Sequence, residues 1–224
     1  MIKELRLLNP ELKILTTAEK SALYEKVEGD YSEIIAMSAK LKPNYANDYI
    51  PNDIESQKTA IVNDVESTVF GELPVQAGWC FGGNPFMNGM EWHKTSEVVV
   101  ACTDAVLLLG NYGDVENDTY DSAKAIGLYI KKGEALELKP MTLHYAPLPV
   151  GEYFKVAIIL PLGTNLQLAG GIKGAKRAVN KWLLVHPENA EDIKAGGKQG
   201  IVGENIKLKR SKIARDNEGT RTII

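Results

Sequence analysis

The sequence of 224 residues predicts a mainly β protein that begins with a helical extension. Between Val65 and Leu160, short apolar runs alternate with turn residues, which is the spacing of an all-β sandwich or barrel. Residues 1–60 carry helix start and stop signals instead. The composition, 44% hydrophobic and 25% charged, is that of a folded domain with a substantial core. We expect three parts, at residues 1–60, 61–190 and 191–224, which are a helical extension packed on the barrel, the barrel, and a polar tail.

Three short helices are expected in the extension. Thr17 is a suitable cap for the first helix and Gly29 a suitable stop. Asn52 and Asp53 can cap the third. The helices are expected from Ala18 to Gly29, over residues 31–41 and over residues 54–58.

The expected strands lie in the middle of the chain. The clearest one runs from Tyr153 to Leu160 and alternates apolar side chains with others. Its less apolar face carries Tyr153 and Lys155, so that Lys155 would reach the centre of the barrel if this face looked inward. The other strands are expected at residues 75–81, 91–102, 105–109, 128–130 and 136–138.

The stretch from Glu91 to Glu97 contains most of the candidate functional residues. On a single strand, Glu91, His93 and Glu97 would point to one face, because side chains alternate. Two carboxylates and an imidazole are costly to bury together, since each resists desolvation and like charges repel. A divalent cation removes both penalties, and the pattern therefore predicts a metal site.

A second histidine, His144, lies in the segment Pro140-Met141-Thr142-Leu143-His144-Tyr145-Ala146-Pro147. Together the two segments resemble the two motifs of the cupin superfamily of small β-barrels, over roughly residues 75–163. Glu91 stands where that superfamily usually has its first histidine, and Thr142 replaces a usual glycine. The resemblance implies a cupin-type double-stranded β-helix, or jelly-roll barrel, with Glu91, His93, Glu97 and His144 as metal ligands.

The mixed ligand set suits manganese, iron, nickel or zinc and does not choose among them. Glu91 or Glu97 could instead act as an acid or base. Lys155 is a further candidate for catalysis and for substrate binding, with Tyr153 and Thr142 as candidates for substrate binding only.

The resemblance favours a metal-dependent enzyme that isomerises or epimerises a small hydroxylated metabolite such as a sugar or sugar phosphate. Cupin sugar isomerases also have mixed Glu and His sites. The alternatives are a lyase or hydrolase similar to ureidoglycolate lyases, an iron dioxygenase, and a cupin that binds a small ligand without turnover. Fold alone does not decide between them.

The charge and the cysteine content indicate which classes of binding partner and which compartment to expect. The formal net charge of −3 provides no positive field for nucleic acid or an anionic membrane, which leaves a small molecule as the expected partner. Cys80 and Cys102 lack metal-ribbon spacing, and no apolar stretch approaches a membrane span. We expect a cytoplasmic protein, and cupins often form homodimers through their sheet faces.

Two features of the C-terminal part have competing interpretations. The Gly- and Lys-rich run from Gly170 to Arg177 offers flexible amides and three cations to an anion, but it matches no phosphate-binding motif, and a solvated turn is the favoured interpretation. His186, beside Pro187, is interpreted as a structural residue near Trp182.

Overall fold

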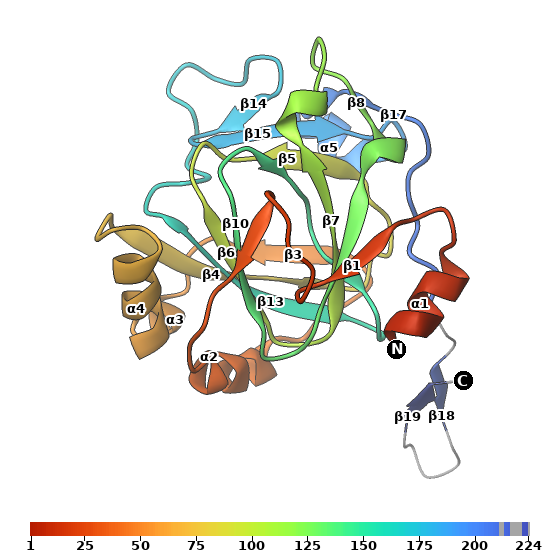
Figure 1. Ribbon diagram of the computed structural model, residues 1–224. Helices are drawn as coiled ribbons and strands as arrows, with labels where there is room; N and C mark the ends of the chain where they lie inside the picture. The colour runs from red at the N-terminus through yellow and green to blue at the C-terminus, as the bar shows by residue number, and fades with distance from the viewer. Residues whose placement is uncertain (211–212, 216–220, 224) are drawn as a thin grey trace.

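The computed structural model describes residues 1–210, 213–215 and 221–223 (Figure 1). Its helices are short and lie at the periphery of the β structure. They are α1 (Ile2–Leu8), α2 (Ser32–Met37), α3 (Ile54–Gln57), α4 (Ala60–Thr68) and α5 (Ala190–Lys194), with the 3-10 helices η1 (Ser38–Lys40), η2 (Tyr112–Asp114) and η3 (Ser122–Lys124). Among the described residues, none of these helices is long and apolar enough to cross a membrane.

Two larger sheets form the body of the molecule. One has the order β1-β9-β7-β11, with β12 also paired to β7, and the other has the order β2-β10-β6-β13-β4-β3. The first sheet contains β1 (Ile14–Thr16), β9 (Ile126–Ile130), β7 (Ala105–Asn111), β11 (Thr142–Leu143) and β12 (Leu148–Pro149). The second contains β2 (Tyr24–Lys26), β10 (Ala135–Leu138), β6 (Glu97–Ala101), β13 (Phe154–Pro161), β4 (Val75–Gly82) and β3 (Asn47–Ile50).

A third, smaller sheet lies across one end of these two, at the top of Figure 1. It has the order β14-β15-β16, with β5 paired to the other side of β15. Its strands are β14 (Lys176–Ala178), β15 (Lys181–Val185), β16 (Lys198–Gln199) and β5 (Gly89–Trp92). Two strand pairs complete the structure, β8 (Tyr120–Asp121) with β17 (Ile201–Val202), and β18 (Ile213–Arg215) with β19 (Arg221–Ile223).

The core between the two larger sheets is apolar. Inward-facing residues of β7 and β9 pack there against those of β6, β10 and β13, for example Leu107 and Leu128 in one cluster with Val99, Leu136 and Val156. This double-sheet arrangement confirms the predicted mainly β, jelly-roll class.

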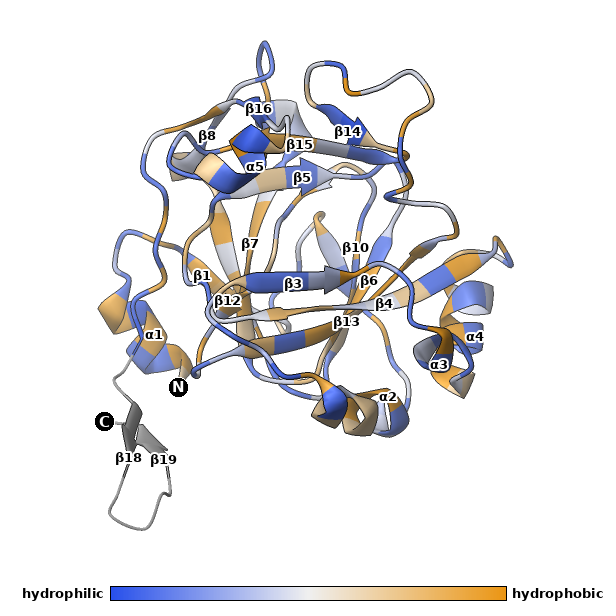
Figure 2. Cartoon of the chain, turned by 180° about the vertical axis from the view of Figure 1, so that it is seen from behind, coloured by the Kyte–Doolittle hydropathy of each residue, from blue (hydrophilic) through white to orange (hydrophobic). Residues whose placement is uncertain are grey.

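The outer face of the six-stranded sheet is also buried. Ile34 of α2 and Val62 of α4 pack there with Val98, Val100 and Ala157. A strand buried on both faces needs apolar residues at every position, which accounts for the uninterrupted run Val98 to Ala101. The strands β4, β6 and β13 are accordingly largely pale or orange in Figure 2, whereas the edge strand β3 begins blue.

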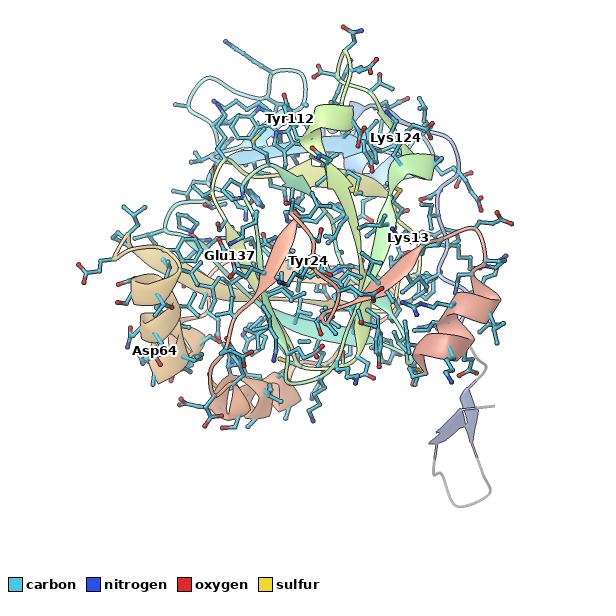
Figure 3. All side chains as sticks on the ribbon, viewed as in Figure 1. Lys13, Tyr24, Asp64, Tyr112, Lys124 and Glu137 are labelled. Atoms are coloured by element: carbon cyan, nitrogen blue, oxygen red, sulfur yellow. The ribbon has the colours of Figure 1, made fainter. Side chains whose placement is uncertain are left out.

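Residues 1–60 contain strands as well as the predicted helices. β1 pairs in parallel with β9, β2 pairs with β10, and β3 pairs with β4. The expected helix from Ala18 to Gly29 is wrong, because this segment supplies β2, in which Tyr24 pairs with Leu138. Tyr24 and Glu137 are labelled in Figure 3 at this edge of the sheet. The helices predicted at residues 31–41 and 54–58 are confirmed as α2 with η1 and as α3.

The predicted polar tail, residues 191–224, lies partly outside the described residues. Its first half is part of the packed structure, since β16 pairs with β15 and β17 pairs with β8. Ile201 and Leu208 are buried against the outer face of the five-stranded sheet.

Candidate metal centre

The two motif segments lie side by side, joined by backbone hydrogen bonds. The Glu91 amide donates to the His144 carbonyl at 2.6 Å, and the His144 amide donates to the Glu91 carbonyl at 2.9 Å. Further along the same two segments, the Met141 amide donates to the His93 carbonyl at 2.8 Å. Antiparallel pairing therefore brings His144 to the same place as Glu91 and His93, although some fifty residues separate them in sequence.

The predicted single strand from Glu91 to Cys102 is wrong. The chain forms β5 up to Trp92, bends over residues 93–96, and enters a different sheet as β6 at Glu97. The alternation argument therefore does not explain why Glu91, His93 and Glu97 converge. The bend explains it, because it turns the start of β6 back toward the end of β5.

Stacked aromatic rings hold β5 against β15. Trp92 pairs directly with Trp182, and their ring centroids lie 6.4 Å apart in a stacked arrangement. On the other side, the Tyr112 ring lies 5.2 Å from the Trp92 ring, at the end of the molecule where Figure 3 labels Tyr112. These contacts position the strand that carries Glu91.

Glu91, His93, Glu97 and His144 each offer one ligand atom, and these four atoms lie within 4.8 Å of one another. Oε2 of Glu97 lies 3.2 Å from His93 Nε2 and 3.3 Å from His144 Nε2. Oε1 of Glu91 lies 3.9 Å and 3.8 Å from the same two nitrogens. His93, Glu97 and His144 are buried, and Glu91 is nearly so. We call these four residues the Glu–His cluster.

Backbone carbonyls fix the orientation of both imidazoles. His93 Nδ1 lies 2.6 Å from the Asn180 carbonyl oxygen, and His144 Nδ1 lies 2.9 Å from the Thr142 carbonyl oxygen. A carbonyl only accepts hydrogen bonds, so each Nδ1 carries the proton and donates it. In the neutral ring, Nε2 then has a free lone pair, and in both residues it faces the Glu97 carboxylate. This is the arrangement of metal-binding histidines.

The cluster has unsatisfied polar atoms that a cation would satisfy. His93 Nε2 is buried and has no hydrogen-bond partner. A deprotonated Nε2 and an ionised carboxylate are both acceptors, so their close approach is costly unless a proton or a metal ion lies between them. Two imidazole nitrogens and two carboxylate oxygens suit a borderline divalent ion. The residues present therefore fit a divalent metal ion.

The same electrostatics shift the pKa values of the cluster. Burial alone would lower the pKa of His144, but the carboxylates of Glu97 and Glu91 outweigh burial and raise that pKa to about 9. Burial alone would raise the pKa of Glu97, but His144 and His93 outweigh it and hold that pKa below its usual range. Without a metal, the cluster therefore retains a proton that a bound cation would replace.

Lys181 of β15 completes the site and was missed by sequence reasoning. Its Nζ forms an ion pair with Oε2 of Glu91 and lies 5.7 Å from the centroid of the Tyr49 ring. Glu91 thus directs Oε1 to the cluster and Oε2 to Lys181. No motif surrounds Lys181, and only the pairing of β15 with β5 brings it here, so the sequence held no signal for it.

A cavity of about 230 Å³ opens beside the cluster. Its inner wall includes Val99, Leu107 and Ile158 from the core between the larger sheets. Its polar lining includes Asn47, Asp48, Tyr49, Asn84, Asn88, Glu91, Glu97, His144, Tyr145, Lys181, Asn189, Glu191 and Asp192. The cluster is therefore accessible to a small molecule from this side.

The structure overturns the prediction for Lys155. Phe154, Val156 and Ile158 face the core between the sheets, so Lys155 lies on the opposite face of β13. Its Nζ donates to the carbonyls of Ser38 at 3.0 Å and Leu41 at 2.9 Å. Lys155 therefore binds the end of the α2–η1 segment instead of a substrate.

Tyr153 and Thr142 are also not among the residues that line the cavity. The Thr142 hydroxyl donates to the Leu23 carbonyl at 2.9 Å, while the Thr142 carbonyl accepts from His144. Thr142 therefore orients a histidine and ties β11 to the segment before β2. The Tyr153 ring lies close to Gly83, at the other end of β13 from the core residue Leu160.

Comparisons with solved structures give only distant similarities. Oxalate decarboxylase of Bacillus subtilis, described with Mn(II) centres, is 13% identical over 43% of this chain and 24% of its own, with a TM-score of 0.30. Procruciferin, the 11S globulin of Brassica napus, is 11% identical over 62% of this chain and 26% of its own, with a TM-score of 0.33. The chain thus spans about a quarter of these structures, and scores this low carry no argument.

No curated protein matches the chain. The β fold and the Glu–His cluster agree with the cupin resemblance, which now rests on observed geometry as well as on the two motifs. A protein-family match covers residues 18–206, which include the whole cluster, Lys181 and the residues that line the cavity. The chain belongs to the family described as Domain of unknown function (DUF4867).

Proposed function

We propose that this protein is a metal-dependent cupin enzyme that isomerises or epimerises a small polyhydroxylated metabolite. The observation that carries the proposal is the convergence of two Nδ1-protonated imidazoles and the buried Glu97 carboxylate on one point at the wall of a small cavity. His93, His144 and Glu97 would hold the ion. When bound, a divalent cation would polarise two adjacent substrate oxygens.

Glu91 is the proposed acid and base of this reaction. Isomerisation between an aldose and a ketose moves a proton between two adjacent carbon atoms, which requires a group that accepts and then returns a proton. Glu91 lines the cavity, and its Oε1 lies farther from the imidazoles than Oε2 of Glu97 does. It is therefore the carboxylate that is less committed to the metal position.

Lys181 supports this role of Glu91. Its ammonium group forms an ion pair with the Glu91 carboxylate and fixes the orientation of that group. Lys181 also lines the cavity, where a cation stabilises the negative charge that develops on a substrate oxygen during proton transfer. Lys181 therefore takes the catalytic and substrate-binding role that the sequence predicted for Lys155.

Metal content tests the first half of the proposal. We expect His93→Ala and His144→Ala to lower the metal content of freshly purified protein at least about tenfold, because each removes a ligand. His186→Ala is the matched control. His186 is buried, but its ring contacts the backbone of Glu188 and Gly203 and is not part of the cluster. Unchanged metal content in both cluster variants would contradict the proposed site.

Turnover tests the second half. Metal-loaded protein is incubated with aldoses, ketoses, uronic acids and sugar phosphates, and the composition is followed by NMR. We expect conversion of at least one compound, lost in Glu91→Gln with metal content retained. Binding without conversion across the panel would show a ligand-binding protein instead of an enzyme.

A further inference from the structure

A second cavity adjoins the one beside the Glu–His cluster. It has a volume of about 460 Å³ and shares four lining residues with the first, namely Tyr49, Tyr145, Lys181 and Asp192. The remaining lining comes from β14, β15 and the loop between β13 and β14. We call the two spaces the inner and the outer cavity. The shared residues place the two cavities side by side, as an elongated ligand that reaches from one to the other requires.

The outer cavity contains a cation without a partner. Arg177 lines it and is partly buried, yet within residues 1–210 no carboxylate lies at ion-pair distance from its guanidinium and no hydrogen bond to it is formed. Arg177 thus offers five guanidinium donors that no acceptor within residues 1–210 uses, and this planar group suits bidentate contact with a carboxylate or phosphate. Arg177 ends the Gly- and Lys-rich run whose favoured interpretation was a solvated turn, and its place in the cavity favours the anion-binding alternative.

The one carboxylate in this lining is already engaged. Asp192 Oδ2 accepts from the Tyr145 hydroxyl at 2.6 Å and from Asn189 Nδ2 at 2.7 Å. The second cation, Lys181, is paired with Glu91. Neither lining residue therefore forms an ion pair with Arg177, and its guanidinium is available to an anionic group of a ligand.

The inner cavity has the opposite charge. Besides the two carboxylates of the cluster, Asp48, Glu191 and Asp192 line it, and Lys181 is the one lysine or arginine in its lining. The five carboxylates outnumber the charges of Lys181 and a divalent ion together, so an anionic group on a ligand is repelled from the inner cavity and attracted to Arg177. The charges therefore orient a ligand with its neutral, hydroxylated end toward the cluster and its anionic end toward the outer cavity.

Asn165 supplies a further polar contact in the outer cavity. Its Nδ2 donates to the Tyr49 hydroxyl at 2.8 Å, but its Oδ1 is buried and has no partner. An unpartnered buried acceptor requires a donor, and a ligand hydroxyl group is one. Leu168, Ile172 and Leu183 supply the apolar part of this wall.

We propose that the outer cavity is a subsite for the anionic end group, a carboxylate or phosphate, of a hydroxylated ligand whose other end reaches the Glu–His cluster. Arg177 binds the anion in a bidentate manner, and Asn165 accepts a hydrogen bond from a hydroxyl along the chain of the ligand. The role assigned to the cluster end rests on the proposed function.

Three probes with the same hydroxylated body test the subsite. D-Glucose, D-glucuronate and D-glucose 6-phosphate differ only in whether the far end is neutral, a carboxylate or a phosphate. Isothermal titration calorimetry measures their Kd values on metal-loaded wild type, Arg177→Gln and the control Lys173→Gln. Lys173 is an exposed lysine in the loop just before the strand that carries Arg177, and it does not line the cavity.

We expect at least one anionic probe to bind wild type and Lys173→Gln about tenfold more tightly than glucose, as a charged hydrogen-bonded pair contributes. In Arg177→Gln this advantage should disappear, while the Kd of glucose stays unchanged. The Kd values of D-glucuronate and D-glucose 6-phosphate then show whether the subsite prefers a carboxylate or a phosphate. Equal affinity for all three probes in wild type, or an advantage that survives in Arg177→Gln, would overturn the subsite.

Metal content measured on the same samples separates the two proposals. A missing advantage of the anionic probes at full metal content contradicts the outer subsite alone. Wild-type protein without bound metal contradicts the proposed function. In that case, an Arg177-dependent advantage of the anionic probes on the metal-free protein still supports the subsite, and its absence overturns it.

Discussion

The two imidazoles of the cluster are oriented by backbone carbonyl oxygens and not by carboxylates. A neutral acceptor on Nδ1 fixes the tautomer without adding negative charge behind the ring. The negative charge of the site then lies with Glu91 and Glu97, of which only Glu91 is balanced by a nearby lysine. At the scale of single residues, the groups proposed to hold an ion are thus distinct from the pair proposed to exchange a proton.

Lys155→Met provides a test at this scale. Lys155 Nζ satisfies two carbonyl oxygens at the end of the α2–η1 segment, and its removal leaves both without this donor. We expect a loss of about 1–3 kcal/mol in the free energy of unfolding, measured by urea denaturation, with metal content unchanged. A variant with wild-type stability but weakened ligand binding would restore the substrate role that the sequence predicted.

The sequence contained the signal for the four cluster residues and a weaker one for Arg177, at the end of the Gly- and Lys-rich run, but none for Lys181. Glu91, His93 and Glu97 are close in the chain, and His144 has a motif of its own. Lys181 reaches the site through the pairing of β15 with β5, which is a long-range contact without a local pattern. Chemistry that depends on tertiary pairing of this kind cannot be read from spacing.

At the scale of elements, the alternating pattern of β13 was predicted correctly, but the face that carries Lys155 does not look into the core between the two sheets. The alternation from Phe154 to Leu160 is real, but both faces are covered, one by the opposite sheet and the other by α2 and α4. Alternation identifies two faces and does not say which one looks inward. The expected helix from Ala18 to Gly29 failed because pairing with β10 outweighs a favourable helix cap.

Helix α3 has a capping residue that links its stability to pH. Asp53 accepts hydrogen bonds from the Ser56 amide, from Lys40 Nζ at 2.8 Å and from Trp79 Nε1 at 3.0 Å. Burial alone would raise the pKa of Asp53, but these hydrogen bonds outweigh it and hold that pKa well below its usual range. The contribution of Asp53 to stability is therefore complete above its unfolded-state pKa of about 4 and is lost as the pH falls below it.

Asp53→Asn tests this linkage. We expect the variant to be less stable than wild type by about 1–2 kcal/mol at pH 7. The difference should shrink as the pH is lowered from 5 to 3, because the Asp53 carboxyl group of the unfolded wild-type chain takes up a proton in this range, whereas that of the folded protein stays ionised. Urea denaturation at pH 7, 5 and 3 measures it, and a difference that stays constant over this range would show that the charge of Asp53 is not responsible.

The whole molecule is organised so that one small sheet closes one end of a two-sheet body (Figure 1). The sequence predicted the body, because its strands are long, apolar and separated by clear turn residues. The small sheet was not predicted, since its strands come from distant parts of the chain and are short. The cluster lies where body and small sheet meet, with Glu91 on β5 and Glu97 on β6.

Metal binding at this junction should stabilise the entire fold. An ion present at about one hundred times its Kd adds about 2.7 kcal/mol to the free energy of unfolding. For a chain of this size, that corresponds to a rise in Tm of about 5–10 °C. Differential scanning calorimetry with and without a chelator measures the rise. His186→Ala should retain it and His93→Ala should lose it, and a rise of equal size in His93→Ala would show that the ion binds elsewhere.

The turn between β14 and β15 contacts both ends of the proposed binding region. Asn180 adopts a left-handed backbone conformation there, with a φ of 54°. Its carbonyl orients His93, its side chain bonds Lys94 and Thr95, and Lys181 follows it directly. The Val179 carbonyl in the same turn accepts from the amide of Asn165, which lines the outer cavity, at 3.0 Å. We expect a shift of this turn on occupation of one end to change the affinity at the other. Thermodynamic reciprocity then requires that ion and organic ligand alter each other's affinity by one common factor, which makes the pair a cooperative unit.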